Sequence, residues 1–481
     1  MTIDIDLKDT NLAVPQKSRE KIKNVKREKL PTNGTTPKKN KRKKIIILVI
    51  VTLVLLGLGF LIYKGYIFSH DLGFRLRPEE LLGREEKSLK KDPSGKYTNV
   101  LLVGLDTREN TGLLNTDTIM MASYNYETND ITLLSIPRDF HVEVEEGVNW
   151  YVRINSIYNV AEQEKQGTGI IALQDTVERV TGQKIQYYAM VDFKAFVGII
   201  DTLGGIDVNV ENSFTDYRYP LGKGYQTVSF EAGPQTMDGE TALIYSRSRH
   251  SLQNNEGSDF ARAKRQQKVI IALKDKLLSS ESLMNPKTIL GILPSIDGNI
   301  RVSEFSTNDI EAALELFKEF NENSGKIYSF VLDTSIGNYS LVENKPMESG
   351  AYAIGPKIAL GDYTDINEFV GLIMTNPALY GEKAKVLIYD TGAGYQTVLA
   401  ITEKLNEGYP YLDITFAGTL RTDREEIIIY SHEEGENSHT VRELSKYLET
   451  DLTTQPDYIT SNLNGEDVTI LIGSNIRTEE E

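Results

Sequence analysis

An uncharged apolar run near the N-terminus constrains the folding of this chain most. Residues 45–63 contain no Asp, Glu, Lys or Arg, and the basic residues 41–44 stand immediately before them. At about 1.5 Å per residue, a helix of this length nearly crosses a hydrocarbon core roughly 30 Å thick. A cleaved signal peptide has a shorter apolar region at the extreme N-terminus. We therefore expect residues 45–66 to stay in place as a single membrane-spanning helix.

The distribution of charge gives this helix a direction. Residues 1–44 hold 14 Lys and Arg against 5 Asp and Glu, although the whole chain has a net charge of -16. Basic residues stay on the cytoplasmic side of a cell membrane, so we expect the N-terminus inside and everything beyond residue 66 outside. The basic tail has too few apolar residues for a core and should be disordered. The acidic remainder argues against a nucleic-acid partner.

The exterior part is predicted to be a two-domain α/β protein. It contains no cysteine, so no disulfide supports it. Residues 67–97 are charged and irregular, which is typical of a spacer. Beyond them, strand-length apolar runs alternate with helical periodicity, which favours layered α/β domains. We predict a layered α-β-α domain over 98–280, an extension and connector over 281–382, and a smaller α/β domain over 383–475.

The individual elements follow from the same alternation. In the first domain, strands are expected over 98–106, 117–124, 130–136, 186–192 and 206–210, and helices over 155–166, 170–181, 193–203, 239–246 and 259–278. Residues 279–382 look less regular. In the second domain, strands are expected over 385–390, 411–418, 427–431 and 468–473, with helices near 396–406 and 440–449.

Two aspartates lie at expected strand ends. Asp106 closes one strand, and Asp117 opens the next after a short loop. Open α/β sheets place their ligands at strand ends, and Mg²⁺ in proteins takes one or two carboxylates together with phosphate oxygens. Isolated strand-end aspartates more often cap turns, so this pair indicates a metal site only in combination with other residues.

Cationic side chains supply that combination. Arg247, Arg249, Arg262 and Arg265 crowd into one short stretch of an acidic chain. The first two are expected to close one helix and the last two to open another. Guanidinium groups bind phosphate oxygens bidentately and stay charged at any working pH. Arg138 follows a strand and a proline, and Arg153 precedes a helix N-terminus, which favours anions. The alternative is an ordinary i,i+3 pair of Asp259 with Arg262 on a solvated helix face.

Seven short motifs in a fixed order make the pattern far more specific. They are GLDTR, NTDTIM, SIPRD, RINSIYN, DFKAFVGIIDTLGGIDV, MDGETALIYSRSRH and SDFARAKRQQ. In this succession the chain resembles the LytR-CpsA-Psr family. The resemblance implies a single-span membrane protein of Gram-positive cells. Such proteins transfer a glycopolymer, for example teichoic acid or capsular polysaccharide, from a polyprenyl pyrophosphate carrier to peptidoglycan. Residues 383–475 resemble the small domain often appended to members of this family.

Carried over position by position, the resemblance assigns a role to each motif residue. It implies that Asp106 and Asp117 bind Mg²⁺ and, with Arg138, form the catalytic group. The side chains that it implies for the lipid pyrophosphate are Arg138, Arg153, Arg247, Arg249, Arg262 and Gln266. Two positions depart from the family pattern. Asn115 stands where arginine is usual, which removes a phosphate ligand unless Arg108 compensates. Arg153 stands where lysine is usual, which replaces a point donor by a planar fork.

The implied reaction is attack by a peptidoglycan hydroxyl on the phosphorus that carries the glycopolymer. Mg²⁺ would bridge the phosphates, and the arginines would neutralise charge on the leaving polyprenyl phosphate. The lipid needs an apolar slot, which we expect between the sheet and helices such as 193–203.

Two other functions use the same residues. With water as acceptor the site would be a polyprenyl pyrophosphate hydrolase, and without turnover it would be a carrier-lipid-binding regulator of the cell wall. No general base is evident, because no histidine forms a convincing pair. The five histidines are His70, His141, His250, His432 and His439.

Overall fold

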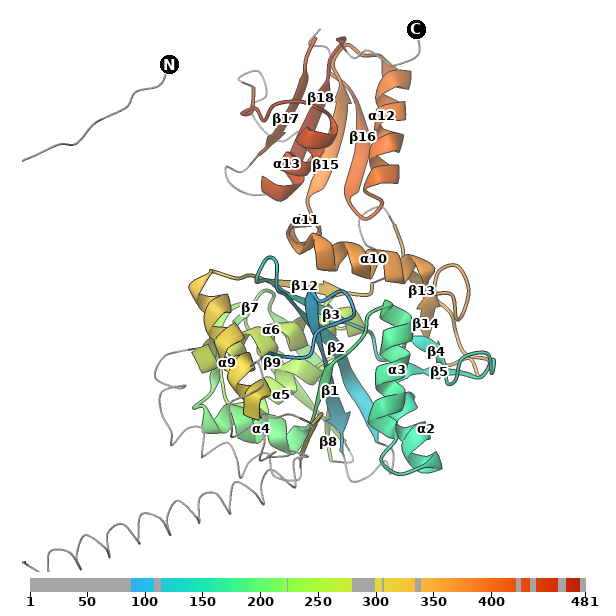
Figure 1. The fold of residues 1–481 in the computed structure, drawn as a ribbon, viewed down its shortest axis with the longest axis vertical. Helices are drawn as coiled ribbons and strands as arrows, with labels where there is room; N and C mark the ends of the chain where they lie inside the picture. Colours follow the sequence, from blue (N-terminus) through green and yellow to red (C-terminus); the bar gives the residue numbers. More distant parts are fainter. Residues whose placement is uncertain are drawn as a thin grey trace, which may run out of the picture. The chain divides into compact units, whose positions relative to one another are not determined.

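The computed structural model describes residues 88–107, 114–222, 224–278, 299–304, 307–333, 339–420, 425–432, 438–456 and 464–475 (Figure 1). These residues all belong to one compact unit, Lys64–Glu481. The expected cytoplasmic tail, the expected membrane helix over 45–66 and most of the expected spacer lie outside the described residues. Within the described ranges, no helix combines the length and the apolar composition needed to cross a membrane.

A mixed six-stranded sheet organises the larger part of this unit. Its strand order is β11-β6-β1-β2-β3-β12. The strands are β1 Tyr97–Asp106, β2 Asn115–Asn125, β3 Ile131–Ser135, β6 Tyr187–Asp192, β11 Ile300–Val302 and β12 Ile327–Val331. The strongly apolar β1 lies inside the sheet, parallel to β6 and antiparallel to β2. The strands expected here from the sequence are confirmed. The two edge strands come from the stretch that looked irregular, because both are short.

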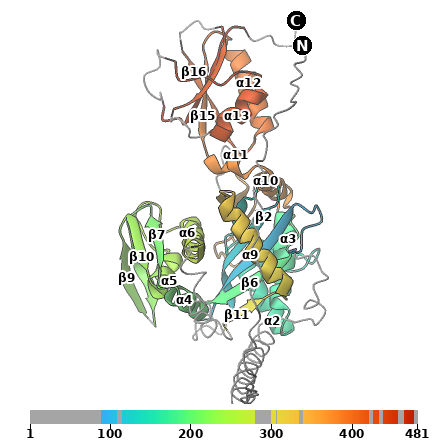
Figure 2. The ribbon, with the colours of Figure 1, turned by 60° about the vertical axis from the view of Figure 1, so that its left-hand side comes forward.

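Helices cover both faces of this sheet, so the α/β class is confirmed. Figure 2 shows α2 Ile157–Glu164 and α3 Gly169–Thr181 on one side and α4 Phe193–Thr202, α5 Gly239–Arg247 and α6 Asp259–Leu278 on the other. Helix α4 contacts β1 and β6, and α6 contacts β3 and β12. Helix α9, Thr307–Glu322, precedes β12. A 3-10 turn, η2 Ile154–Ser156, leads into α2 and shortens the expected helix.

Four hairpin-like strand pairs were not expected as such from the sequence. They are β4 His141–Glu143 with β5 Tyr151–Arg153, β7 Ile206–Val210 with β10 Gly233–Met237, β8 Phe214–Leu221 with β9 Gly224–Phe230, and β13 Val342–Asn344 with β14 Ile354–Pro356. Phe214 and Phe230 stack at 5.2 Å between ring centroids and pack with Tyr245 of α5. This second core fixes the β8–β9 hairpin against the end of α5.

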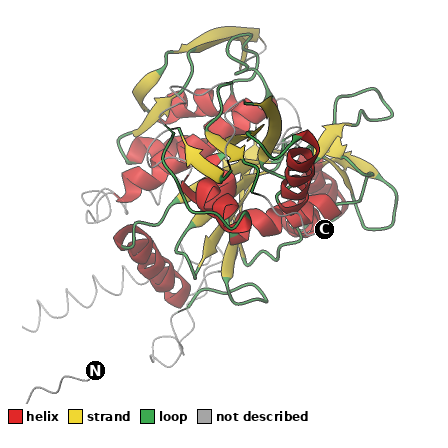
Figure 3. Ribbon diagram, turned by 90° about the horizontal axis from the view of Figure 1, so that it is seen from above, coloured by secondary structure: helices red, strands yellow, loops and turns green. Residues whose placement is uncertain are grey.

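The C-terminal residues form a second, four-stranded sheet with order β16-β15-β18-β17. Its strands are β15 Lys385–Asp390, β16 Asp413–Thr419, β17 Ile427–Ser431 and β18 Val468–Ile472, and its helices are α12 Tyr395–Gly408 and α13 Ser438–Tyr447. These elements confirm the expected strands and helices of this region. Helices α10 Thr364–Thr375 and α11 Pro377–Glu382 precede them, so the connector is more regular than expected. Figure 3 shows helices and strands through both parts.

Candidate functional site

A β-bulge at the start of β2 sets the direction of Asp117. Gly104 of β1 pairs with Thr118, whereas Leu105 pairs with Thr116, so Asp117 is the extra residue. A bulge bends its strand and re-aims a side chain. Glycine is required opposite it, because a Cβ at position 104 would lie 2.8 Å from Oγ1 of Thr118. The bulged aspartate lines a cavity between the sheet and the helices.

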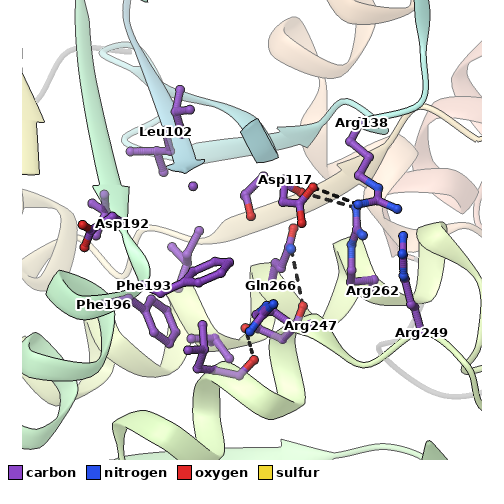
Figure 4. Close-up of a pocket in the computed structure, with 18 of the residues that line it drawn as sticks. Leu102, Asp117, Arg138, Asp192, Phe193, Phe196, Arg247, Arg249, Arg262 and Gln266 are labelled. Carbon is purple, nitrogen blue, oxygen red and sulfur yellow. Dashed lines mark hydrogen bonds and ion pairs between the residues drawn. The ribbon is translucent and has the colours of Figure 1, made fainter. Parts of the chain in front are cut away.

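This cavity, of about 330 Å³, has an apolar end and a cationic end (Figure 4). The apolar side chains come from β1, β6 and helices α4 to α6: Leu102, Val103, Ala189, Val191, Phe193, Phe196, Ile199, Leu243, Val269, Ile270 and Leu273. The polar lining includes four arginines and Gln266, together with other polar side chains: Asp117, Thr118, Arg138, Asp192, Tyr219, Ser246, Arg247, Arg249, His250, Arg262 and Gln266. The predicted convergence of the arginines and the predicted slot beside α4 are both present.

Arg138 is held at the cationic end by carboxylates. Its Nη1 donates to Oδ1 of Asp117 at 2.8 Å, and its Nε lies 3.5 Å from oxygens of Asp139 and Asp259. The side chain is only 14% exposed. Burial works against its charge, yet Asp117, Asp259 and Asp139 together raise the pKa of Arg138. This guanidinium therefore stays charged inside the cavity wall.

Arg262 shares one of these carboxylates. Its Nη2 lies 2.9 Å from Oδ1 of Asp259 and donates to the backbone oxygen of Asp117 at 3.3 Å. The i,i+3 pair considered from the sequence therefore exists, but Arg262 is 5% exposed, so the face is buried rather than solvated. Burial lowers the pKa of Arg262 and raises the pKa of Asp259.

Two buried donors at this end lack a hydrogen bond. Within the described residues, neither Nε of Arg138 nor Nε of Arg262 has a hydrogen-bond partner. Leaving a buried charged donor unsatisfied costs free energy. Nε of Arg138 still lies 3.5 Å from the carboxylates of Asp139 and Asp259, which compensate its charge without a hydrogen bond.

Arg247 and Arg249 bring further positive charge to the cavity. Arg247 donates to the hydroxyl of Tyr219 at 3.1 Å and lies over the ring of Phe193, 4.1 Å from its centroid. Arg249 lies beyond α5, because the extended backbone of Ser248 (ψ 137°) ends the helix at Arg247. The expectation that both arginines close this helix is therefore wrong for Arg249. Neither guanidinium forms an ion pair in the described part of the chain.

Arg265, the fourth arginine of the stretch, supports the fold instead. It is 2% exposed, donates to the backbone oxygen of Tyr245 at 3.0 Å, and also contacts Ser248 and Glu256. These contacts join α6 to the end of α5. Burial lowers the pKa of Arg265.

Other predicted site residues are not among those that line the cavity. Asp106 is buried at the end of β1, opposite Asn115. Arg153 caps η2, pairs with Asp139 at 3.0 Å and is 41% exposed. Arg108 lies outside the described residues. The structure therefore brings together Asp117, Gln266 and four arginines, with Arg153 joined to them through Asp139.

Asp106 and Asp117 do not by themselves make up a complete cation site in the described part of the chain. Among the residues that the structure describes, no group of three or more His, Asp or Glu is placed to hold a metal. An ion at Asp106 and Asp117 would take its other ligands from phosphate and water. Mg²⁺ is usually bound in this manner.

His250 is a cavity residue that the sequence did not reveal. Its Nδ1 lies 3.7 Å from Oδ1 of Asp216, which is fully buried. Asp216 also accepts the backbone N–H of Arg249 at 2.9 Å. This aspartate lies on the unpredicted β8–β9 hairpin, far from His250 in the chain. No local spacing signals the pair.

Comparison with known proteins identifies the family to which the seven sequence motifs belong. The family model LytR_cpsA_psr matches residues 77–342, more than half of the chain. The chain belongs to the LytR_cpsA_psr family. The resemblance recognised in the sequence motifs is therefore confirmed. Tyr352, β14 and the second sheet lie beyond the residues that the family model matches.

Two curated relatives show the extent of the similarity. This LytR_cpsA_psr protein is 30% identical over 244 residues to the cell wall biosynthesis protein LcpA of Corynebacterium glutamicum, with 43% of this chain and 45% of LcpA covered. It is 30% identical over 246 residues to the polyisoprenyl-teichoic acid–peptidoglycan teichoic acid transferase TagU of Halalkalibacterium halodurans, with 50% of this chain and 73% of TagU covered. The chain thus spans less than half of the length of LcpA. The crystal structure of B. subtilis TagV matches with a TM-score of 0.43 and 22% identity, covering 58% of this chain and 96% of TagV.

Proposed function

We propose that this LytR_cpsA_psr protein is a Mg²⁺-dependent phosphotransferase that moves a cell-wall glycopolymer from a polyprenyl pyrophosphate carrier to peptidoglycan. The observation that carries the proposal is that one cavity has both an apolar end and a cationic end. A polyprenyl pyrophosphate has the same two parts joined in one molecule. The relative TagU is named as a transferase of teichoic acid to peptidoglycan, which supports the choice of polymer and acceptor.

The arginines would bind the pyrophosphate and stabilise the negative charge that develops on the leaving polyprenyl phosphate. Arg138, Arg247, Arg249 and Arg262 all line the cavity and would supply N–H donors to the pyrophosphate. An acceptor hydroxyl oxygen forms a bond to the phosphorus that carries the glycan and releases its proton to solvent water. The bond from that phosphorus to the bridging oxygen breaks, and polyprenyl phosphate leaves with the negative charge. Preorganised donors at the place where charge develops lower the barrier to such a step.

The two strand-end aspartates would hold Mg²⁺ in this proposal. Bound there, the ion supplies Lewis-acid neutralisation of phosphate oxygens. Arg138 keeps the carboxylate of Asp117 oriented through the 2.8 Å contact. The protein would be anchored by residues 45–66 in the cell membrane, with its N-terminus in the cytoplasm and the cavity outside.

One assay separates this function from its two alternatives. The full chain in detergent is incubated with a short polyprenyl-pyrophosphoryl saccharide, peptidoglycan oligomers and Mg²⁺, and the products are identified by mass. We expect a saccharide-phosphate adduct on the oligomer, which is lost when EDTA is added. Free saccharide phosphate without an adduct would identify a hydrolase. Carrier binding without any product would identify a regulator that binds carrier lipid.

A further inference from the structure

A rigid hairpin beyond the family-matched residues presents an exposed tyrosine. The β13–β14 ladder continues toward its turn, because Lys345 N donates to Ala353 O at 2.9 Å and Met347 N donates to Ala351 O at 3.0 Å. The peptide groups before Tyr352 and after Ala353 are thereby hydrogen-bonded. Its neighbour Ala353 is buried, whereas Tyr352 is 54% exposed. The ring therefore stands in solvent on an ordered backbone.

This hairpin is attached to the backbone of Asp139, whose carboxylate lies 3.5 Å from Nε of Arg138. Ile354 N donates to Asp139 O at 3.1 Å, and Ile354 forms a parallel bridge with Phe140. Partial burial, followed by the charges of Asp139 and Asp259, raises the pKa of Tyr352. The tyrosine therefore lies within electrostatic reach of the two carboxylates that contact Nε of Arg138. Its strand is joined to the cationic end through the backbone bond of Ile354 to Asp139, and Tyr352 is not one of the residues that line the cavity.

The hairpin makes Tyr352 suitable as a contact for a ligand. An exposed aromatic ring has only two side-chain torsions to immobilise, so binding to it loses little conformational entropy. Its faces are electron-rich, and one face of a pyranose ring presents mostly C–H groups, which form weak contacts with such a surface. Arg153, which is 41% exposed and pairs with the same Asp139, would offer N–H donors to sugar hydroxyl groups.

We propose that Tyr352 is a stacking platform for a sugar ring of the acceptor glycan, placed so that a neighbouring hydroxyl reaches the phosphorus. The proposal rests on the transferase function and adds an acceptor subsite to it. The carrier lipid and its pyrophosphate would fill the cavity itself. An acceptor must then approach from outside the cavity, past the carboxylates at the cationic end, and Tyr352 is the exposed ring next to them.

The test compares Tyr352→Ala with Tyr352→Trp and with a matched control, Tyr395→Ala. Tyr395 is equally exposed, at 55%, but belongs to α12, which accompanies the second sheet. For each full-length variant, the KM for the peptidoglycan oligomer and the Kd for the carrier are measured. We expect Tyr352→Ala to raise the acceptor KM roughly tenfold, a typical loss for one aromatic stacking contact. The carrier Kd should stay unchanged, and the Trp variant and the control should behave like the native chain.

Each other outcome overturns part or all of the proposal. A changed carrier Kd with an unchanged acceptor KM would place the donor sugar on Tyr352 and refute the acceptor assignment. Native transfer with an unaltered KM in Tyr352→Ala would refute the platform while leaving the transferase function intact. A native chain that forms no adduct would refute both. Thermal unfolding of each variant separates these results from misfolding, because an exposed ring contributes little to stability.

Discussion

Asp117 combines two tasks in one carboxylate at the residue scale. It is the bulged residue of β2, and it accepts from Arg138 at 2.8 Å while facing the proposed metal position. Asp117→Asn keeps the size of the side chain, and Asp139 and Asp259 remain as counter-charges for Arg138. We expect transfer at limiting Mg²⁺ to fall about 100-fold, or roughly 2.7 kcal/mol. Transfer rates measured across a Mg²⁺ series check this, and full activity at low Mg²⁺ would disprove metal binding by Asp117.

Asn115 stands where the sequence resemblance leads us to expect an arginine. It lies opposite Asp106 in the β1–β2 register and is partly exposed. If this strand end normally contributes a cation to the pyrophosphate, Asn115→Arg should tighten carrier binding about 10- to 100-fold, since a charge-assisted contact contributes roughly 1.5–3 kcal/mol. If Arg108 has taken over that role, the added arginine brings no gain, and Arg108→Ala is the damaging change. The carrier affinities of the two variants distinguish these explanations. If neither variant changes the affinity, the segment between β1 and β2 does not contact the ligand.

At the scale of elements, helix α6 and the segment that follows α5 carry arginines with opposite roles. Arg265, buried against α5, should be needed for folding, because Arg265→Met leaves Glu256 and two carbonyls without their donor. Removing one partner of a buried pair costs about 3–5 kcal/mol, which urea unfolding measures. Arg249→Met in the cavity is the matched control. It should change the free energy of unfolding by less than about 1 kcal/mol. It should raise the activation barrier of transfer by roughly 2–5 kcal/mol. Equal stability losses would contradict this division.

The β4–β5 hairpin, next to the Tyr352 segment, should respond to acid. Backbone N–H groups of Asn149 and Gly147 donate to the Glu143 carboxylate at 2.5 and 3.1 Å, and these bonds lower its pKa below the ordinary 4.5. Because the pKa of Glu143 is lower in the folded chain, its carboxylate stabilises the hairpin fully above pH 4.5. That stabilisation is lost as the pH falls through the lowered pKa of the folded chain. The protection factors of these two amides against hydrogen exchange, corrected for the intrinsic rate at each pH, should therefore fall in acid. Glu143→Gln should remove the pH dependence, and identical pH profiles for both chains would refute the prediction.

The same scale shows how far sequence reasoning extends. Continuous apolar runs such as β1 and β15 predict strands well, because burial on both faces demands them. Short or half-exposed strands escape, as in the polar alternation of β9, since tertiary packing rather than local preference holds them. The arginines could be predicted to converge from the order of their motifs. The bulge at Asp117 and the approach of Asp216 to His250 could not, because each depends on a pairing register between distant residues.

At the scale of the whole molecule, charge and hydrophobicity divide the chain into a basic tail, an apolar run and an acidic exterior part. Whether the run crosses a membrane remains a prediction, and the chain offers a direct test because it contains no cysteine. Single cysteines can be introduced at Thr35, in the tail, and at the exposed Ser94, beyond the run. Each then reports its own side of the membrane to a membrane-impermeant maleimide.

Basic flanks stay in the cytoplasm, so in intact cells we expect labelling of Ser94→Cys and no labelling of Thr35→Cys. Permeabilised cells provide the control, because both cysteines should react there. Deleting residues 1–66 should release the protein from the membrane fraction, since no other part of the chain is predicted to anchor it. Labelling of Thr35→Cys in intact cells would reverse the orientation. That result would place the cavity in the cytoplasm, where peptidoglycan cannot reach it, and would refute the proposed transfer together with the topology.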